Sequence, residues 1–365
     1  MRYVFVIILG IHALIHLIGF VSAFFSIEIS NQLLGISKPM GLLWLITFIL
    51  FIITASQFLD NKKWFYIAFI TVLLSQILII ITWRDAKYGT IVNSIILLVS
   101  LSAFGNHRFE DMVEREKENL LVNNKDLNTR LITQEDINEL PEIVQLWLKK
   151  SGVLGAESIS SVRLEQQGLM RIKPNGKWMP FEATQCFNTL DPSFVWSTKV
   201  NTMPIIAMVG RDKLVNGEGE MLIKLAGLIP IVNESENNKI NSGAMLRYLA
   251  ETCWFPQATI NDYLKWEAIN STSAKATLTI NKESVSGIFK FNIEGELLSF
   301  EANRYYGGEE NSKLEKWLIE TLSFKVFDGI KIPKKSKVTW KLEDGDFNWL
   351  TLEIMDIKYN VLHVY

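Results

Sequence analysis

Four uncharged apolar blocks in the first hundred residues constrain this chain more than any other feature. They span residues 3–25, 40–59, 64–83 and, shorter than the others, 88–104. About 20 helical residues, at roughly 1.5 Å of rise each, cover the roughly 30 Å hydrocarbon core of a bilayer. The sequence therefore predicts a four-helix transmembrane unit over residues 1–104, with membrane lipid as its first partner.

The basic residues that flank these blocks predict the orientation of the chain. If the N-terminus is cytoplasmic, the cytoplasmic flanks carry six Lys or Arg residues and the opposite flanks carry three. Lys and Arg are enriched on the cytoplasmic side. Four spans would then return the C-terminal part to the cytoplasm, with a periplasmic location as the alternative.

Polar residues inside the blocks are candidates for a site within the membrane. His12 and His16 are four residues apart and share a helical face. They could carry protons or a metal, or they could hydrogen-bond across the bundle as neutral imidazoles, together with Gln76 and Asn93. Asp85 lies in a charged segment that is expected to be a solvated turn, and alternatively it could form a polar pocket with Asn93 at the mouth of the bundle. Because no zinc or haem ligand pattern occurs, we expect no metal and no cofactor.

A charged linker is expected over residues 105–138, between the membrane unit and a domain over residues 139–365. Residues 108–121 predict a helix with a mostly solvated charged face. A second helix should begin at Pro141 and stop at Gly152. The two cysteines, Cys186 and Cys253, are too few for a disulfide framework and are expected to be core thiols.

After Gly152 the hydrophobic period changes from 3.6 to 2, which predicts strands. Turn signals between the runs indicate antiparallel hairpins, and so many strands normally curl into a half-barrel. One amphipathic helix, over 241–254, should pack in the concavity of this sheet through Leu246, Leu249 and Ala250. About eleven strands are predicted, at residues 158–172, 177–189, 193–201, 212–225, 263–270, 273–281, 284–294, 296–306, 316–327, 335–344 and 347–359.

The string Arg247-Tyr-Leu-Ala-Glu251-x-x-Trp254-Phe255-Pro256 resembles the mark of an uncharacterised bacterial domain family. The membrane half resembles the four-helix module of some members, through His12-x-x-x-His16. The resemblance implies a bacterial inner-membrane location but no reaction. The strand count and central helix are similar in architecture to the half-barrels of bacterial lipoprotein carriers.

Aromatic and polar residues of the soluble domain are candidates for a ligand site. An apolar cleft with a few polar groups is typical of small-molecule sites, although aromatics at strand spacing also build cores. The candidate ligand-binding residues are Trp178, Phe181, Gln185, Trp196, Arg211, Arg247, Glu251, Trp254, Phe255, Trp266 and Arg304.

Three functions stay open, and nucleic-acid binding is not among them. The part after residue 104 carries more acidic than basic residues, whereas phosphates need a basic face. The favoured function is a membrane-tethered binding domain for a lipid, an acyl chain or a lipidated partner, without catalysis. One alternative is an enzyme acting on a lipophilic substrate through Glu182, Glu301 and Arg304. The other is a structural membrane module with a solid core.

Overall fold

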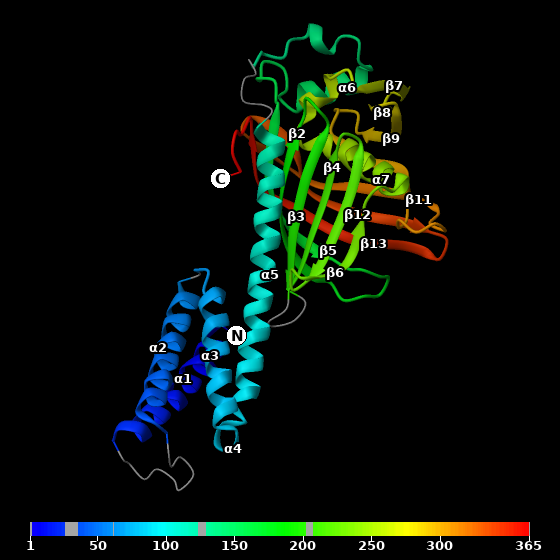
Figure 1. Ribbon diagram of the computed structural model, residues 1–365. Coiled ribbons are helices and arrows are strands. Elements are labelled where there is room, and N and C mark those ends of the chain that lie inside the picture. Colours follow the sequence, from blue (N-terminus) through cyan, green and yellow to red (C-terminus); the bar gives the residue numbers. More distant parts are fainter. Residues whose placement is uncertain (1, 26–35, 61, 123–128, 202–206, 365) are drawn as a thin grey trace. The chain divides into compact units, whose positions relative to one another are not determined.

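The computed structural model describes residues 2–25, 36–60, 62–122, 129–201 and 207–364 (Figure 1). Contacts within the chain define two compact units. The first unit contains residues 1–108 with short segments at 203–207 and 226–228. The second contains the rest of the chain from Phe109 onward.

The first unit is built from apolar helices, as the sequence predicts. α1, α2 and α5 are long and apolar enough to cross a membrane, judged by length and composition, and α3 is a shorter apolar helix of 17 residues. Pro39 lies in the first turn of α2, where its missing N–H costs no hydrogen bond. The bounds are α1 Arg2–Phe24, α2 Lys38–Leu59, α3 Phe65–Ile81, α4 Trp83–Ala86 and α5 Gly89–Val122.

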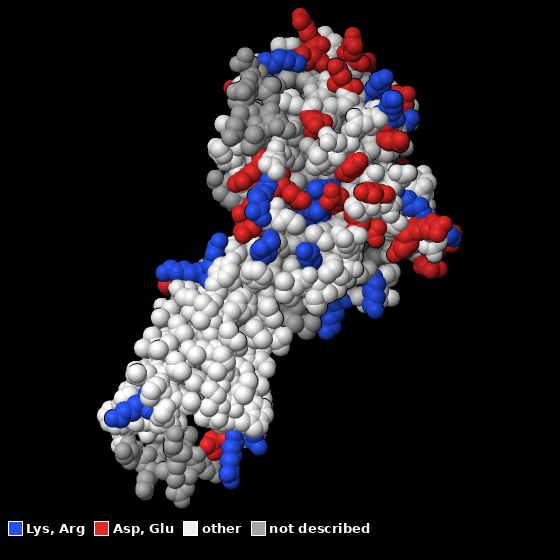
Figure 2. Space-filling model, in the orientation of Figure 1, with Lys and Arg blue, Asp and Glu red and all other residues white. Residues whose placement is uncertain are grey.

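Apolar side chains of this unit point both inward and outward. Leu9 and Phe51 are fully buried between the helices. Ile11, Ile70 and Leu98 are 57%, 61% and 66% exposed. On the face drawn in Figure 2, the helical unit is nearly free of charged side chains between its ends. A surface of this kind requires an apolar environment or a covering partner.

The fourth apolar block and the charged segment after it form one helix, α5, and not two. The change in composition near Gly105 alters the surroundings of the helix but not its backbone hydrogen bonding. The charged half of α5 is also less solvated than the sequence suggests. Phe109, Val113 and Lys117, each one turn further along, are 4%, 3% and 3% exposed within the second unit.

The second unit contains one antiparallel sheet of 13 strands that curls into a half-barrel (Figure 1). The strand order is β6-β5-β4-β3-β2-β1-β13-β12-β11-β10-β9-β8-β7. Val162 of β1 pairs with Tyr359 of β13, so the pairing joins the first and last strands of the chain. The bounds are β1 Ser161–Met170, β2 Met179–Asn188, β3 Ser193–Asn201, β4 Ala207–Val215, β5 Glu218–Leu225, β6 Ile229–Glu234, β7 Leu264–Asn270, β8 Ser273–Ile280, β9 Glu283–Phe291, β10 Leu297–Tyr305, β11 Leu314–Phe327, β12 Ile330–Leu342 and β13 Gly345–Tyr359.

The sheet has two more strands than the eleven that the sequence predicts. The expected strand over 212–225 is a hairpin of β4 and β5, because Asn216 and Gly217 turn the chain with φ of 54° and 82°. Asn-Gly is a strong two-residue hairpin signal, since both residues tolerate positive φ. β6 was not predicted; it contains Pro230 and lies at the sheet edge, where proline removes no interior ladder hydrogen bond.

α7 (Asn238–Glu251) packs in the concavity of the sheet, as predicted. Asn237 caps it by accepting hydrogen bonds from the backbone N–H groups of Lys239 and Ile240. The helix contacts β5 on one wing of the sheet and β8, β9 and β10 on the other. Leu249, at the centre of its apolar face, is completely buried. The shorter helices are α6 Glu142–Lys150 and the 3-10 turns η1 Glu135–Ile137, η2 Thr252–Trp254 and η3 Pro256–Ile260.

The alternation of side chains along β2 separates two cores. Phe181, Ala183 and Phe187 point into the large concave cluster that includes α7. Cys186 points to the outer face, into a smaller cluster with Phe109 and other residues of α5. Successive side chains of a strand point to opposite faces, so the same strand contributes side chains to both clusters. In Figure 1 the C-terminal half of α5 runs beside β2 and β3.

Candidate functional site

A hydrogen-bonded network of polar side chains is buried inside the helical unit. His12 Nε2 is 3.0 Å from Asn93 Oδ1, and His16 Nε2 is 2.9 Å from Ser75 Oγ. Asn93 Nδ2 donates to Gln76 Oε1 at 3.1 Å. The network joins α1, α3 and α5 and includes four of the five membrane residues singled out from the sequence. Ser75 is an addition that the sequence did not signal.

Asp85, the fifth of these residues, is exposed on α4 and takes no part in the network. Across the described parts of the chain, no group of three His, Cys, Asp or Glu side chains could hold a metal ion. His12 and His16 each make a hydrogen bond to another helix, and His16 also bonds the backbone oxygen of His12 within α1. Interhelical hydrogen bonds of this kind hold the helices of a bundle together.

Changing His12 and His16 together to Leu is expected to leave the chain in the membrane fraction, because Leu lowers the cost of insertion. Ile11→Leu with Ile15→Leu, on exposed positions of the same helix, is the matched control. Both proteins would be fractionated, and metal and haem would be measured on the purified samples. A stoichiometric metal or haem present in the wild type and lost only in the histidine variant would contradict a packing role.

A cluster of paired charges lies between α7 and the concave face of the sheet. Arg247 Nη1 lies 2.6 Å from Asp212 Oδ2, and Arg247 Nε lies 2.8 Å from Glu251 Oε1. Gln185 Nε2 donates to Glu251 Oε2 at 2.8 Å. The guanidinium also stands 4.9 Å from the ring centroid of Trp196. Burial raises the pKa of Glu251, against the opposing charge of Arg247. The expected Arg247–Glu251 pair is therefore present, and both charges are satisfied within the protein.

Two further arginines from the candidate set form no ion pair within this cluster, although the charge of Arg304 interacts with those of Asp212, Arg247 and Glu251. Arg211 is on the other face of β4, where it forms ion pairs with Glu116 at 3.1 Å and Glu220 at 2.9 Å. Arg304 lies 4.7 Å from the ring centroid of Trp317 and has no ion pair with any residue that the structure describes. Burial lowers the pKa of Arg304 to about 10, so it remains charged at neutral pH.

The aromatic candidates belong to the concave core or to its edge. Phe181, Trp254 and Phe255 are buried in the large cluster. Trp196 and Trp266 pack against it and are partly buried. Trp178 is 38% exposed, with Arg171 above its ring at 4.7 Å. All of these side chains except Trp178 therefore belong to the packing of the concave core.

The acidic residues considered for catalysis are not brought together. Glu182 is exposed on β2, whereas Glu301 is on β10, and four strands lie between them in the sheet order. Glu301 forms an ion pair with Lys290 at 3.0 Å. An acid–base pair needs two groups within reach of one substrate, and this arrangement does not supply it.

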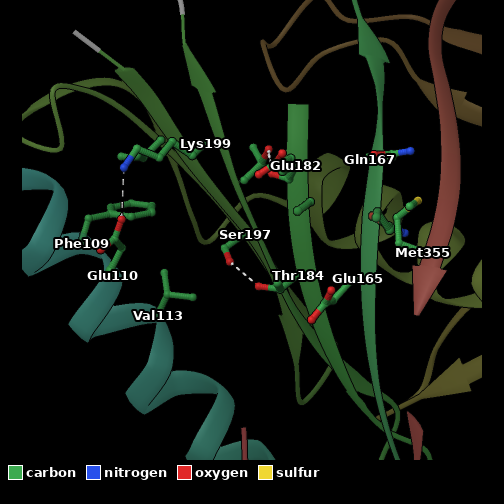
Figure 3. A pocket seen from close by; sticks show the side chains of 14 residues that line it. Phe109, Glu110, Val113, Glu165, Gln167, Glu182, Thr184, Ser197, Lys199 and Met355 are labelled. Carbon is green, nitrogen blue, oxygen red and sulfur yellow. Dashed lines mark hydrogen bonds and ion pairs between the residues drawn. The ribbon is translucent and has the colours of Figure 1, made fainter. Parts of the chain in front are cut away.

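A groove of about 550 Å³ lies on the outer side of the sheet, between the C-terminal half of α5 and strands β1–β4 (Figure 3). Its volume falls within the range of about 300–1,000 Å³ that small-molecule sites occupy. None of the eleven candidate ligand-binding residues lines it. Its apolar side chains are those of Phe109, Val113, Val209 and Met355. Its other lining residues are Ala183, whose side chain belongs to the concave core, and Glu110, Glu165, Gln166, Gln167, Glu182, Thr184, Ser197, Thr198 and Lys199.

A buried lysine lies behind the polar part of this groove. Lys117 Nζ donates to Ser197 Oγ at 2.9 Å and to the backbone and side-chain oxygens of Thr184. Within the described residues it has no carboxylate within 4.0 Å. Burial lowers the pKa of Lys117 to about 8, with the nearby Cys186 and Glu114 opposing the shift. The sequence could have suggested this residue, since Phe109, Val113 and Lys117 share one helical face.

Lys117→Met is expected to remove a rise in thermal stability that the wild type shows from about pH 8 toward pH 10.5. Folded Lys117 loses its proton near pH 8 and unfolded lysine near 10.5. Between these values the unfolded state binds more protons, so stability increases with pH. Melting temperatures of the full chain would be measured in detergent at pH 7.5, 8.5 and 9.5. The melting temperature of the wild type should increase relative to that of the variant as the pH rises.

Comparison with the variant separates the effect of Lys117 on stability from the effect of its neighbour Cys186. Burial raises the pKa of Cys186 to about 11, against the charge of Lys117, and a raised thiol pKa lowers stability at alkaline pH in both proteins. The interval from pH 7.5 to 8.5, below the titration of the thiol, therefore reports Lys117. Parallel curves for wild type and variant would mean that Lys117 titrates as a solvated lysine.

Comparisons with known proteins identify a family but no activity. A family model described as a family of unknown function, DUF6920, matches residues 138–359. No curated protein matches the chain. Among solved structures, a LolA superfamily protein from Nitrosomonas europaea is similar over 59% of this chain and 92% of its own, with 10% identity and a TM-score of 0.35. A DUF1329 family protein from Desulfovibrio piger is similar over 60% of this chain and 92% of its own, with 9% identity and a TM-score of 0.33.

Proposed function

The chain belongs to the DUF6920 family, whose function is unknown, and we propose that it is a membrane-anchored binding protein for a lipophilic ligand. The apolar helices form the anchor, and the half-barrel unit carries the binding site. The observation that carries the proposal is the groove between α5 and strands β1–β4, in which Phe109, Val113, Val209 and Met355 lie beside polar side chains.

The helical unit has the surface of a membrane anchor. Its outward-facing Ile and Leu side chains would be costly in water and favourable in lipid. α3, with 17 residues, reaches the lower limit of about 17–25 residues for a spanning helix. We therefore propose four spans in a bacterial inner membrane, with the half-barrel unit on the cytoplasmic side.

A reporter fused after the last residue tests the orientation. The six-to-three distribution of basic residues leads us to expect a cytoplasmic signal from an enzyme such as β-galactosidase. The matched fusion uses alkaline phosphatase, which is active only outside the cytoplasm. Strong phosphatase activity at this position would reverse the proposed orientation and leave the groove on the periplasmic side.

The groove is a better place for a ligand than the concavity of the sheet. α7 fills the concavity together with the buried candidates Phe181, Trp254 and Phe255, and Trp196 and Trp266 pack against this cluster. The groove, by contrast, is open space with Phe109 and Val113 on one wall and Val209 on another. These three side chains are already packed against one another, whereas Met355 in the same lining is 44% exposed. An acyl chain would cover the exposed part of the lining, which stabilises the complex by about 25 cal/mol per Å² of apolar surface removed from water.

Lipids that co-purify with the full chain in mild detergent would be identified by mass spectrometry. We expect a lipophile bound in stoichiometric amount, and we expect Met355→Trp, which fills the groove from β13, to reduce its occupancy at least several-fold. Val326→Trp, at a similarly exposed strand position outside the groove, is the control. Equal occupancy in the two variants would place the ligand elsewhere. No ligand in any sample would favour a structural module with a solid core.

A further inference from the structure

We propose that the groove recognises a carboxylate head group, so that its ligand is a single-chain fatty acid. The head group would be bound by the hydroxyls of Thr184 and Ser197, in front of the Lys117 ammonium. The inference rests on the proposed function, because it names the chemical class of the ligand that the groove receives.

The hydrogen bonds of the two hydroxyls leave a donor without an acceptor. The ammonium of Lys117 has three N–H donors, and the backbone oxygen and hydroxyl of Thr184 and the hydroxyl of Ser197 accept them. Each hydroxyl therefore keeps its own O–H to donate. Thr184 Oγ1 and Ser197 Oγ are 3.3 Å apart, so one O–H can serve the contact between them. The second has no acceptor among the residues that the structure describes, and both hydroxyls line the groove (Figure 3).

The charge behind these hydroxyls favours an anionic oxygen. Lys117 is 3% exposed, and its side chain has no ion pair with a described residue. A buried charge is normally paired, because removing it from water without a counter-ion is costly. The hydroxyls that accept from the ammonium are polarised by it, and their O–H groups then donate more strongly. A ligand carboxylate at this position would supply the missing negative charge.

The arrangement of α5 places the apolar part of the ligand beside the head group. Phe109, Val113 and Lys117 are spaced by four residues and lie on one face of the helix. Eight residues of α-helix span about 12 Å. An acyl chain that follows Val113 and Phe109 would therefore begin at the hydroxyl pair and run along the apolar wall.

The remaining charges of the groove select for a singly charged head group. Glu110 is paired with Lys199 at 3.5 Å. Glu165 and Glu182 are exposed and unpaired by any residue within the described ranges. Their negative charges oppose a multiply charged phosphate more than a carboxylate, since the repulsion scales with the ligand charge. We therefore commit to a carboxylate, carried by a fatty acid, and not to a phosphate monoester.

The full chain, delipidated in detergent, would be titrated with oleate and with methyl oleate, two ligands that share a chain and differ in the head-group charge. We expect oleate to bind about ten- to a hundredfold more tightly, the range that hydrogen bonds to a charged group support. Lys117→Met should reduce this ratio toward one and leave the affinity for methyl oleate unchanged. Thr184→Val with Ser197→Ala should also reduce the ratio of the two affinities toward one, although the lysine is kept. This double variant tests the inference if Lys117→Met does not fold.

Lys199→Met is the matched control, because Lys199 also lines the groove but is half exposed and paired with Glu110. It should keep most of the preference for oleate. Acetate and inorganic phosphate, each added in excess, should not displace oleate, since neither has an acyl chain. A wild type that binds both ligands equally, or variants that keep the full preference, would overturn the inference. Failure of both ligands to bind would instead count against the proposed function.

Discussion

Arg247→Met is expected to lower the free energy of unfolding by about 3–5 kcal/mol, the range for removing one partner of a buried ion pair. Asp212 and Glu251 would be left close together without their common counter-ion. The side chains of the three residues are 16%, 10% and 9% exposed, so water would compensate for little of the loss. An exposed pair spaced by four residues on a helix would contribute only about 0.3–0.5 kcal/mol. Denaturant unfolding of the full chain, monitored by tryptophan fluorescence, would measure the difference.

The ion pair between Lys275 and Glu267 provides the control for this variant. Their side chains are 43% and 67% exposed. Lys275→Met should therefore cost less than about 1 kcal/mol. If Arg247→Met cost no more than Lys275→Met, the charges around Arg247 would be solvated in the native protein. A triple change of Arg247 to Met with Asp212 and Glu251 to Leu should recover part of the loss, because it removes the two unpaired carboxylates but leaves the buried charge of Arg304.

Leu249→Ala is expected to lower the free energy of unfolding by about 2–5 kcal/mol, as truncation of a buried leucine does. Leu249 is fully buried at the centre of the face of α7 that packs in the concavity. Because α7 contacts both wings of the sheet, a cavity at this position loosens contacts on both sides. The same denaturant titration would report the change.

Leu322→Ala, at a position of β11 that is 51% exposed, is the matched truncation. It should change the free energy of unfolding by about 0.5 kcal/mol or less. A loss for Leu249→Ala as small as this would contradict the packing of α7 inside the sheet. Both titrations would be repeated with oleate. A ligand that binds the native state raises the free energy of unfolding in every variant that keeps the groove, so this increase tests binding independently of the packing of α7.

The sequence by itself determined the classes of structure in this protein. The length and lack of charge of the early blocks predicted the apolar helices, because an uncharged run of about 20 residues has few other stable forms. The change of hydrophobic period after Gly152 predicted the antiparallel sheet, and the stripe around Leu249 predicted its inner helix. These patterns are local in the sequence. They predict the structure correctly because each arises from the burial of one face of a helix or strand. The Asn216-Gly217 pair is an equally local pattern, and it could have predicted the turn between β4 and β5.

Only the tertiary structure decided which charged residues are buried and where open space remains. Residues 108–121 predicted a solvated helix, but contact with β2 and β3 buries Lys117 against Thr184 and Ser197, which are 67 and 80 residues away. The Arg247–Glu251 spacing predicted a local pair, but whether it is exposed depends on the sheet that surrounds it. The candidate aromatics fill the concavity, and the groove formed instead on the outer face. Cavities and buried charges depend on contacts between distant segments, and the spacing of residues in the sequence does not record those contacts.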